Sequence, residues 1–345
     1  MRFSQMVRAS LSALMLLVLL NSSALAGKTG PGTSTGTGRV FFPNPVASLQ
    51  DQTLTDQKDA DYAALQPAYE TVTLTDLDGS GFLRGRWANI RGETGSLAFS
   101  ATNTFVYGRH DDRFEQVMAY FWVTEAQKYI QSLGFNGVTR RPINMESQDI
   151  RINQYGIDNS YSWDKHDILR FGKGGVDDAE DAEVILHEYG HAMQDSQMVP
   201  FGFGSSIEAG SIGEGFGDYW AVTVSDVIAP TPDPACVADW DSVSYTTSTV
   251  PHCLRRVDGN LHYPEDLNGR VHHDGQIWSR ALWDIRAALG HVKADTVILE
   301  AQFQFAPDTN MPDAAQATVN AAQSIYGSAE ANAVLAAFQA RGILP

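Results

Sequence analysis

The chain is poor in cysteine, and cationic residues are scarce. Only Cys236 and Cys253 occur among 345 residues, so no disulfide framework and no CxxC metal site is available. Lysine and arginine together number 24, against 41 aspartates and glutamates, which gives a formal charge of −17. A surface with this charge repels nucleic acid and anionic lipid. We therefore expect neither of them as a partner.

Long hydrophobic runs are also missing, apart from one near the start. Two arginines precede an uncharged, mostly apolar run from Ala9 to Leu20, and Ala-Leu-Ala follows at 24–26. This order is that of a secretory signal peptide, and the run is shorter than the roughly 20 residues that span a bilayer. We predict cleavage after Ala26, which removes residues 1–26, and a secreted, extracellular protein without a membrane span. An uncleaved anchor is the alternative.

The two cysteines lie in a proline-punctuated region at residues 229–270. In an exported chain such a pair favours a disulfide, and closing this loop would stabilise the fold by about 3 kcal/mol. We therefore predict a Cys236–Cys253 disulfide. Two free buried thiols are the alternative.

The rest of the chain changes character along its length. Residues 27–38 are rich in Gly, Ser and Thr and predict a flexible leader, and residues 39–110 have the short Thr-, Val- and Phe-containing runs of strands and hairpins. Apolar residues then recur at helical spacing. They predict a long buried helix from Asp112, helices at 178–196 and 210–228, and several Ala-rich helices within 274–340. The fold class predicted is α+β, with a β-rich N-terminal half and a helical C-terminal half.

The sequence HEYGH at residues 187–191 falls between these halves. On a helix, residues four apart share a face, so His187 and His191 can hold one ion together. Glu188 lies one step round the helix, in reach of a water at the ion, which suits a general base. Two surface histidines on an amphipathic helix are the bland alternative. The apolar residues around the motif argue against it, because they indicate a buried helix, where unpaired imidazoles are costly.

A catalytic site needs a third ligand. The pattern HExxHxxGxxH is excluded, because Gln194 and Gln197 stand where it requires glycine and histidine. The later run GEGFGDYWA instead offers Glu214, with Asp218 four residues on and hence on the same helix face. Two histidines and one glutamate leave a coordination position open for water. Asp218 is placed to accept a hydrogen bond from His187. In the alternative, Glu214 only caps a helix that begins near residue 213.

HEYGH followed by GEGFGDYWA resembles the secreted zinc endopeptidases of the thermolysin and fungalysin superfamily, over about residues 155–290. The resemblance implies a two-lobed peptidase with one catalytic Zn²⁺. Residues 111–196 would form its N-terminal catalytic lobe and residues 197–345 its helical C-terminal lobe. The interval between His191 and Glu214 is longer than in thermolysin itself. Nothing in the ligand set excludes manganese or cobalt.

Two further stretches fit the same family. RVHHDGQIW resembles the segment that carries the histidine which stabilises the oxyanion, and the alignment gives that role to His272 and makes His273 a spectator. Glu265 and Asp266 are candidates for the carboxylate that orients it. GIDNSYSW resembles the edge strand that receives substrate, which places Asn159 against the peptide and the Ser160 carbonyl near the leaving amine. A plain turn is the alternative.

Some family features are missing from the sequence. No counterpart of the oxyanion-holding tyrosine is evident, and the acidic calcium sites are not recognisable, although Glu183 is a candidate Ca²⁺ ligand. The leader before the β-rich region is too short for the family's long inhibitory propeptide. Either activation works differently in this protein, or residues 40–70 play some part in it.

We predict a monomeric, exported zinc endopeptidase that acts on proteins or peptides. One alternative is a surface or matrix-binding protein of little turnover on a metallopeptidase scaffold. Another is a zinc hydrolase whose substrate is not an internal peptide bond.

Overall fold

The computed structural model describes residues 34–345 except 93–94, 198–205 and 246–249. The predicted signal peptide and residues 27–33 lie outside this range. Strand β1 (Ser34–Phe41) occupies the end of the predicted leader, so the prediction of a flexible segment is wrong at 34–38. Its glycines serve close packing, since a Cβ at Gly38 would lie 2.8 Å from Val117.

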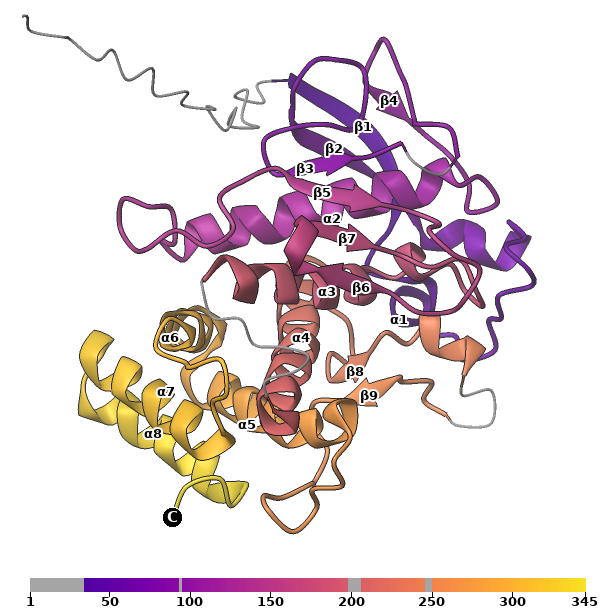
Figure 1. Cartoon of the computed structure of the whole chain (residues 1–345). Coiled ribbons are helices and arrows are strands. Elements are labelled where there is room, and N and C mark those ends of the chain that lie inside the picture. Colours follow the sequence, from indigo (N-terminus) through magenta and orange to yellow (C-terminus); the bar gives the residue numbers. More distant parts are fainter. Residues whose placement is uncertain (1–33, 93–94, 198–205, 246–249) are drawn as a thin grey trace, which may run out of the picture.

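Two small sheets build the N-terminal half (Figure 1). The first has the order β2-β1-β4 and the second the order β3-β5-β7-β6. Their further strands are β2 (Tyr69–Leu77), β3 (Ala88–Ile90), β4 (Thr104–Phe105), β5 (Gln148–Arg151), β6 (Tyr161–Trp163) and β7 (Ile168–Arg170). In the second sheet only β6 runs antiparallel, and it forms an edge of that sheet. Residues of this edge strand line a cavity next to the HEYGH helix.

The long helix predicted from Asp112 is present as α2 (Arg113–Ser132). Most of its side chains are buried, including Phe114, Tyr120 and Trp122 at 0% exposure. It ends just before Gly134, which adopts a positive φ of 94° that disfavours other residues. The helix lies beside the sheets and also packs on α3 (Ala182–Ser196), so it joins the β-rich part to the helix that carries HEYGH.

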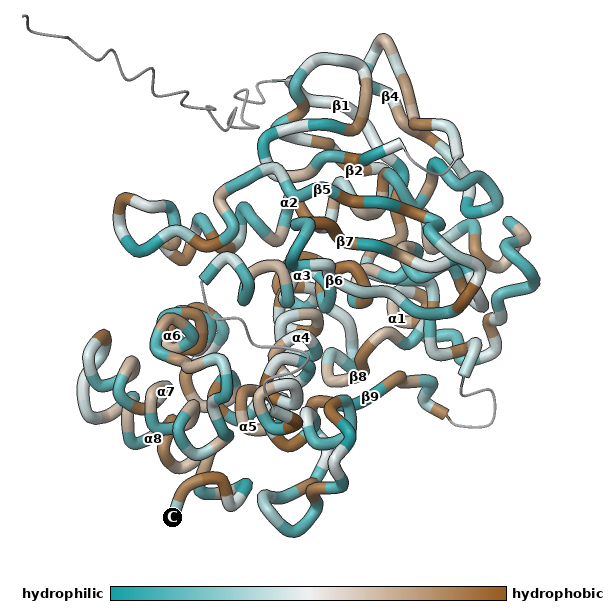
Figure 2. Tube along the Cα trace, viewed as in Figure 1, coloured by the Kyte–Doolittle hydropathy of each residue, from teal (hydrophilic) through white to brown (hydrophobic). Residues whose placement is uncertain are grey.

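The helical half starts with α4 (Ile207–Ile228), which lies centrally between the sheets and the remaining helices (Figure 1). The remaining helices are α5 (Val271–Leu289), α6 (His291–Gln302), α7 (Met311–Ile325) and α8 (Ser328–Ala340). Hydrophobic and hydrophilic residues interchange along α7 and α8, as expected for helices with one buried face (Figure 2). The prediction of an α+β fold with a β-rich first half and a helical second half is confirmed.

Short elements complete the chain. They are α1 (Pro45–Leu49), the 3₁₀ turns η1 (Ala63–Ala68), η2 (Asp164–His166), η3 (Asp178–Glu180) and η4 (Asp241–Ser244), and a ladder of β8 (Cys236–Val237) with β9 (Arg255–Arg256). Among the described residues no helix is both long and apolar enough to cross a membrane. The Cys236–Cys253 disulfide is present beside the ladder, so that prediction is confirmed.

Parts of residues 40–70 are buried near the start of the HEYGH helix, while many of their other side chains are exposed. Arg109 is 1% exposed, and its guanidinium binds Glu180 at 2.8 Å and Asp56 at 2.6 Å. Asn44 donates to Asp181, the residue that caps the start of α3. Replacing Arg109 would leave the buried charge of Glu180 unpaired, which is strongly destabilising. This segment therefore helps to fix the position of α3.

Candidate metal centre

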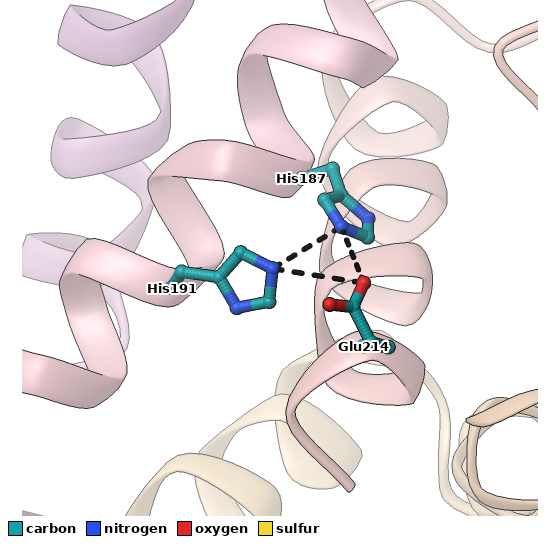
Figure 3. A group of neighbouring side chains, drawn as sticks. All are labelled: His187, His191 and Glu214. Atoms are coloured by element: carbon teal, nitrogen blue, oxygen red, sulfur yellow. Dashed lines mark hydrogen bonds and ion pairs between the residues drawn. The ribbon is translucent and has the colours of Figure 1, made fainter. Parts of the chain in front are cut away.

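Two neighbouring helices bring three side chains to one point (Figure 3). His187 and His191 project from α3, and Glu214 projects from α4. The Nε2 atom of His187 lies 3.2 Å from Nε2 of His191 and 3.2 Å from Oε2 of Glu214, and the third separation, between His191 and Glu214, is 3.8 Å. Glu214 is the eighth residue of α4, so the alternative in which it merely caps a helix is wrong.

These distances suit a metal ion. Four ligands about 2.0–2.2 Å from a tetrahedral ion are about 3.3 Å from one another. Two imidazole nitrogens face each other here, and a hydrogen bond between them can use a proton from only one of the two rings. A cation between two nitrogens and a carboxylate satisfies all three donors. His187 and Glu214 are nearly buried, which keeps competing water away.

Glycines on α4 allow the close helix contact that the cluster needs. A Cβ at Gly217 would lie 2.8 Å from the imidazole of His187, and a Cβ at Gly215 would lie 2.3 Å from the carbonyl oxygen of Gly275 on α5. A side chain at either position would therefore push α4 away from its neighbours. The glycines of GEGFGD are a packing requirement of the site.

Asp218 lies behind the first histidine. Its Oδ1 is 2.9 Å from Nδ1 of His187, so it fixes the ring with Nε2 turned toward the cluster. Burial opposes a charge on His187, but hydrogen bonds with Asp218 and Glu214 outweigh it and raise the pKa of the ring to about 10. The sequence placed each pair on one face of its own helix, and the structure brings the two faces together.

Arg255 is the member of the centre that the sequence did not reveal. Its guanidinium donates two hydrogen bonds to Asp218, from Nε to Oδ2 at 2.7 Å and from Nη2 to Oδ1 at 2.8 Å. Burial opposes the charge of Asp218, yet Arg255 and His187 together lower the pKa of that carboxyl far below its usual range. Arg255 belongs to β9, which pairs with β8 next to the disulfide. No local spacing in the sequence signals this contact, because it depends on where the β8–β9 ladder docks.

Glu188 faces the same cavity as the cluster. Burial, joined by the charge of Glu214 and opposed by His187, raises its pKa to about 7. A carboxylate with that pKa can both accept and return a proton near neutral pH. The geometry and the proton affinity of Glu188 thus agree with the role expected for it.

A cavity of about 480 Å³ opens at the centre. Its walls include the edge strand β6 on one side and His272 at the start of α5 on the other. Asn159 and Ser160 line it directly before β6, and the Ser160 hydroxyl donates to Asp178. An unpaired strand edge beside a cavity offers backbone groups to an extended peptide. The structure thus places both predicted substrate-binding residues at this cavity.

The structure also separates the two adjacent histidines. The Nε2 atom of His272 lies 3.2 Å from Oε2 of Glu214, whereas His273 binds Asp274 at 3.0 Å through Nδ1. Only His272 of the two lines the cavity among the residues described. Asp266 accepts from the His262 backbone instead. Among the interactions of the described residues, His272 is paired with Glu214, and no contact joins it to either predicted orienting carboxylate.

Glu183 gains no support as a calcium ligand. One of its oxygens accepts from Ser225 Oγ at 2.6 Å and the other from the Ala238 amide at 2.7 Å. Both oxygens are therefore already used to tie α3 to α4 and to the segment after β8.

His187, His191 and Glu214 lie beside Glu188 at a cavity. This is the arrangement expected of a metallopeptidase. The comparisons with known proteins agree. Residues 153–295 match the model of the family described as fungalysin metallopeptidase (M36), a range that contains the whole cluster. This segment of the chain is therefore similar to the fungalysin family, and the resemblance found in the sequence is confirmed over these residues.

Solved structures extend the similarity beyond that segment. The fold is similar to that of the precursor of protealysin, a metalloproteinase from Serratia proteamaculans, with a TM-score of 0.58 and 18% identity. The alignment covers 74% of this chain and 85% of the other. The expected thermolysin-like, two-lobed architecture is thereby confirmed. No curated protein matches the chain.

Proposed function

We propose that the protein is an exported zinc endopeptidase. The observation that carries the proposal is the meeting of His187, His191 and Glu214 beside Glu188, in a cavity bordered by a free strand edge. This ligand set is that of catalytic zinc sites, which keep one position open. The predicted signal peptide supports export, and the family match supports peptide bonds as the target.

Zinc held by these three residues would polarise the scissile carbonyl and lower the pKa of water toward about 7. The chain's own residues supply the other steps. Glu188 takes a proton from the attacking water and returns it to the nitrogen of the leaving amine. His272, at the opposite wall, donates a hydrogen bond to the carbonyl oxygen as negative charge develops there, a contact that typically contributes about 3 kcal/mol.

Positioning comes from residues around these groups. The Arg255–Asp218 pair holds the ring of His187 in one orientation. The edge of β6 takes the backbone of the extended substrate, and Asn159 contacts the peptide next to the scissile bond. These contacts place the carbonyl between Glu188 and His272.

The decisive test is Glu188→Gln. The variant should keep its metal and lose cleavage of casein by a factor of about 10²–10⁴, because the amide cannot accept the proton. Metal content by elemental analysis and a zymogram with and without phenanthroline are the measurements. Glu70→Gln, at an exposed position on β2, is the matched control.

Near-parental cleavage by Glu188→Gln would remove this mechanism. Bound metal without chelator-sensitive proteolysis in the parent would favour a binding protein on a metallopeptidase scaffold. Cleavage of a mixed peptide library would separate an endopeptidase from a hydrolase of other substrates.

A further inference from the structure

Three acidic side chains meet where the start of α2 lies beside the segment that leads into η3. Asp112 is the N-cap residue of α2, Glu115 belongs to its first turn, and Asp177 directly precedes η3. One oxygen of each lies within 4.8 Å of the other two. None of the three is among the described residues that line the cavity at the metal centre, so this acidic group is separate from the centre.

Two of these carboxylates are buried without a partner. Glu115 is 0% exposed and Asp177 is 1% exposed. Within the part of the chain that the structure describes, neither oxygen of Glu115 has a hydrogen-bond partner in another residue, and Oδ1 of Asp177 has none either. An ionised carboxylate in such a place is strongly disfavoured unless a cation binds it. The free oxygens therefore point to a cationic ligand.

The chain supplies only part of the positive charge that this group needs. The Nζ atom of Lys173 lies 2.7 Å from Oδ1 of Asp112 and 3.7 Å from Oδ2 of Asp177. The N-terminus of α2 adds roughly half an elementary charge. The guanidinium of Arg109 is already paired with Glu180. The three carboxylates thus keep roughly one and a half negative charges uncompensated, which suits a divalent cation.

The donor atoms indicate which cation fits. All three groups offer carboxylate oxygen, which favours calcium or magnesium over zinc. Both oxygens of Glu115 are free, so this side chain can bind one ion through both, as calcium permits, whereas magnesium requires a strict octahedron. The side chain of Asp112 is 48% exposed, so water can reach the ion and complete the six to eight oxygen ligands of calcium.

We propose that Asp112, Glu115 and Asp177 bind one calcium ion. The ion joins the start of α2 to the segment that continues through η3 into α3, the HEYGH helix. It competes with the ammonium group of Lys173 for Asp112 and Asp177, because the two cations repel each other. This inference goes beyond the proposed function and does not depend on it.

The test is calorimetric titration of calcium into the zinc-loaded, full mature chain, with Glu188→Gln as the background that prevents self-digestion. One calcium ion should bind per chain. Glu115→Gln and Asp177→Asn should each weaken its affinity at least about tenfold, because each removes one charged ligand. Lys173→Gln should tighten it by at least about threefold, because it removes a competing cation. Calcium should also raise the midpoint of thermal unfolding, since it binds the folded chain.

Two control variants locate the ion. Asp158, Asp178 and Asp241 form another acidic group whose oxygens lie within 4.8 Å of one another, and Asp241→Asn tests whether calcium binds there instead. Asp308→Asn, on an exposed turn, tests for a general effect of charge. Both variants should bind calcium as tightly as the parent. Circular dichroism checks that each variant folds.

The proposal is overturned if the parent binds no calcium, or if Glu115→Gln and Asp177→Asn bind it as tightly as the parent. Loss of binding in Asp241→Asn alone also overturns it, because the ion then belongs to the other acidic group. Should Glu115→Gln fail to fold, Lys173→Gln decides the question. A calcium affinity that stays the same or falls in Lys173→Gln contradicts the proposed competition and the site with it.

Discussion

Two groups of carboxylates near Glu188 differ in how they are compensated. Glu214 and Asp218 are surrounded by imidazoles and the Arg255 guanidinium, and although burial opposes it, these partners lower the pKa of both. Asp178 and Asp241 are equally buried, and in the part of the chain that the structure describes neither forms a salt bridge with lysine or arginine. Burial raises the pKa of Asp178 to about 7. Nearby cations thus favour the ionised carboxylate in the first group, whereas burial favours the protonated form in the second.

The largest effect on metal binding and proteolysis is expected from a substitution of Glu214. Glu214→Gln removes the negative ligand while keeping the volume, so metal binding and proteolysis should both fall to background. Elemental analysis after dialysis measures the first and casein cleavage the second. A Glu214→Gln protein that retains one metal and its activity would show that another residue completes the site.

A smaller loss is expected from Asp218→Asn. The amide no longer balances the charge of Arg255 and holds His187 less firmly, so metal affinity or activity should fall by about 10–100-fold. Competition with a zinc indicator measures the affinity. Asp226→Asn, which removes the partner of Arg286 elsewhere on α4, is the matched control. Equal affinity in Asp218→Asn and the parent would mean that the helices alone orient His187.

The smallest effect is expected for a substitution of Asp241, and it should change the stability of the fold. Burial and the neighbouring Asp178 raise the pKa of Asp241 well above its ordinary value. Its protonated form therefore stabilises the fold fully below the unfolded pKa of about 3.9, and this stability is lost as the pH rises toward the folded pKa. Asparagine does not titrate. The free energy of unfolding of Asp241→Asn should therefore rise relative to that of the parent as the pH rises, by on the order of 1 kcal/mol.

Urea unfolding of parent and variant at pH 5 and pH 8, without metal, measures this gain. Asp308→Asn should show no such trend. A stability difference that is independent of pH would mean that Asp241 titrates normally in the folded chain.

The sequence predicted helix α2 and the HEYGH helix well, because their apolar residues repeat at helical spacing and both helices are capped or ended by local signals. It was less successful at residues 34–38. Glycine there suggested flexibility, and only the pairing of β1 with β2 shows why small residues are needed. Local composition does not tell a flexible glycine from a tightly packed one.

At the metal centre, too, the sequence predicted some of the contacts and the tertiary structure decided the others. Spacing within a helix determined that His187 pairs with His191 and Glu214 with Asp218, because residues four apart share a face. Only the tertiary structure decided that these two faces meet, that Arg255 closes on Asp218, and that His272 stands at the cavity while His273 turns to Asp274. Contacts between distant segments depend on how helices and loops dock, and a repeat of 3.6 residues carries no information about docking.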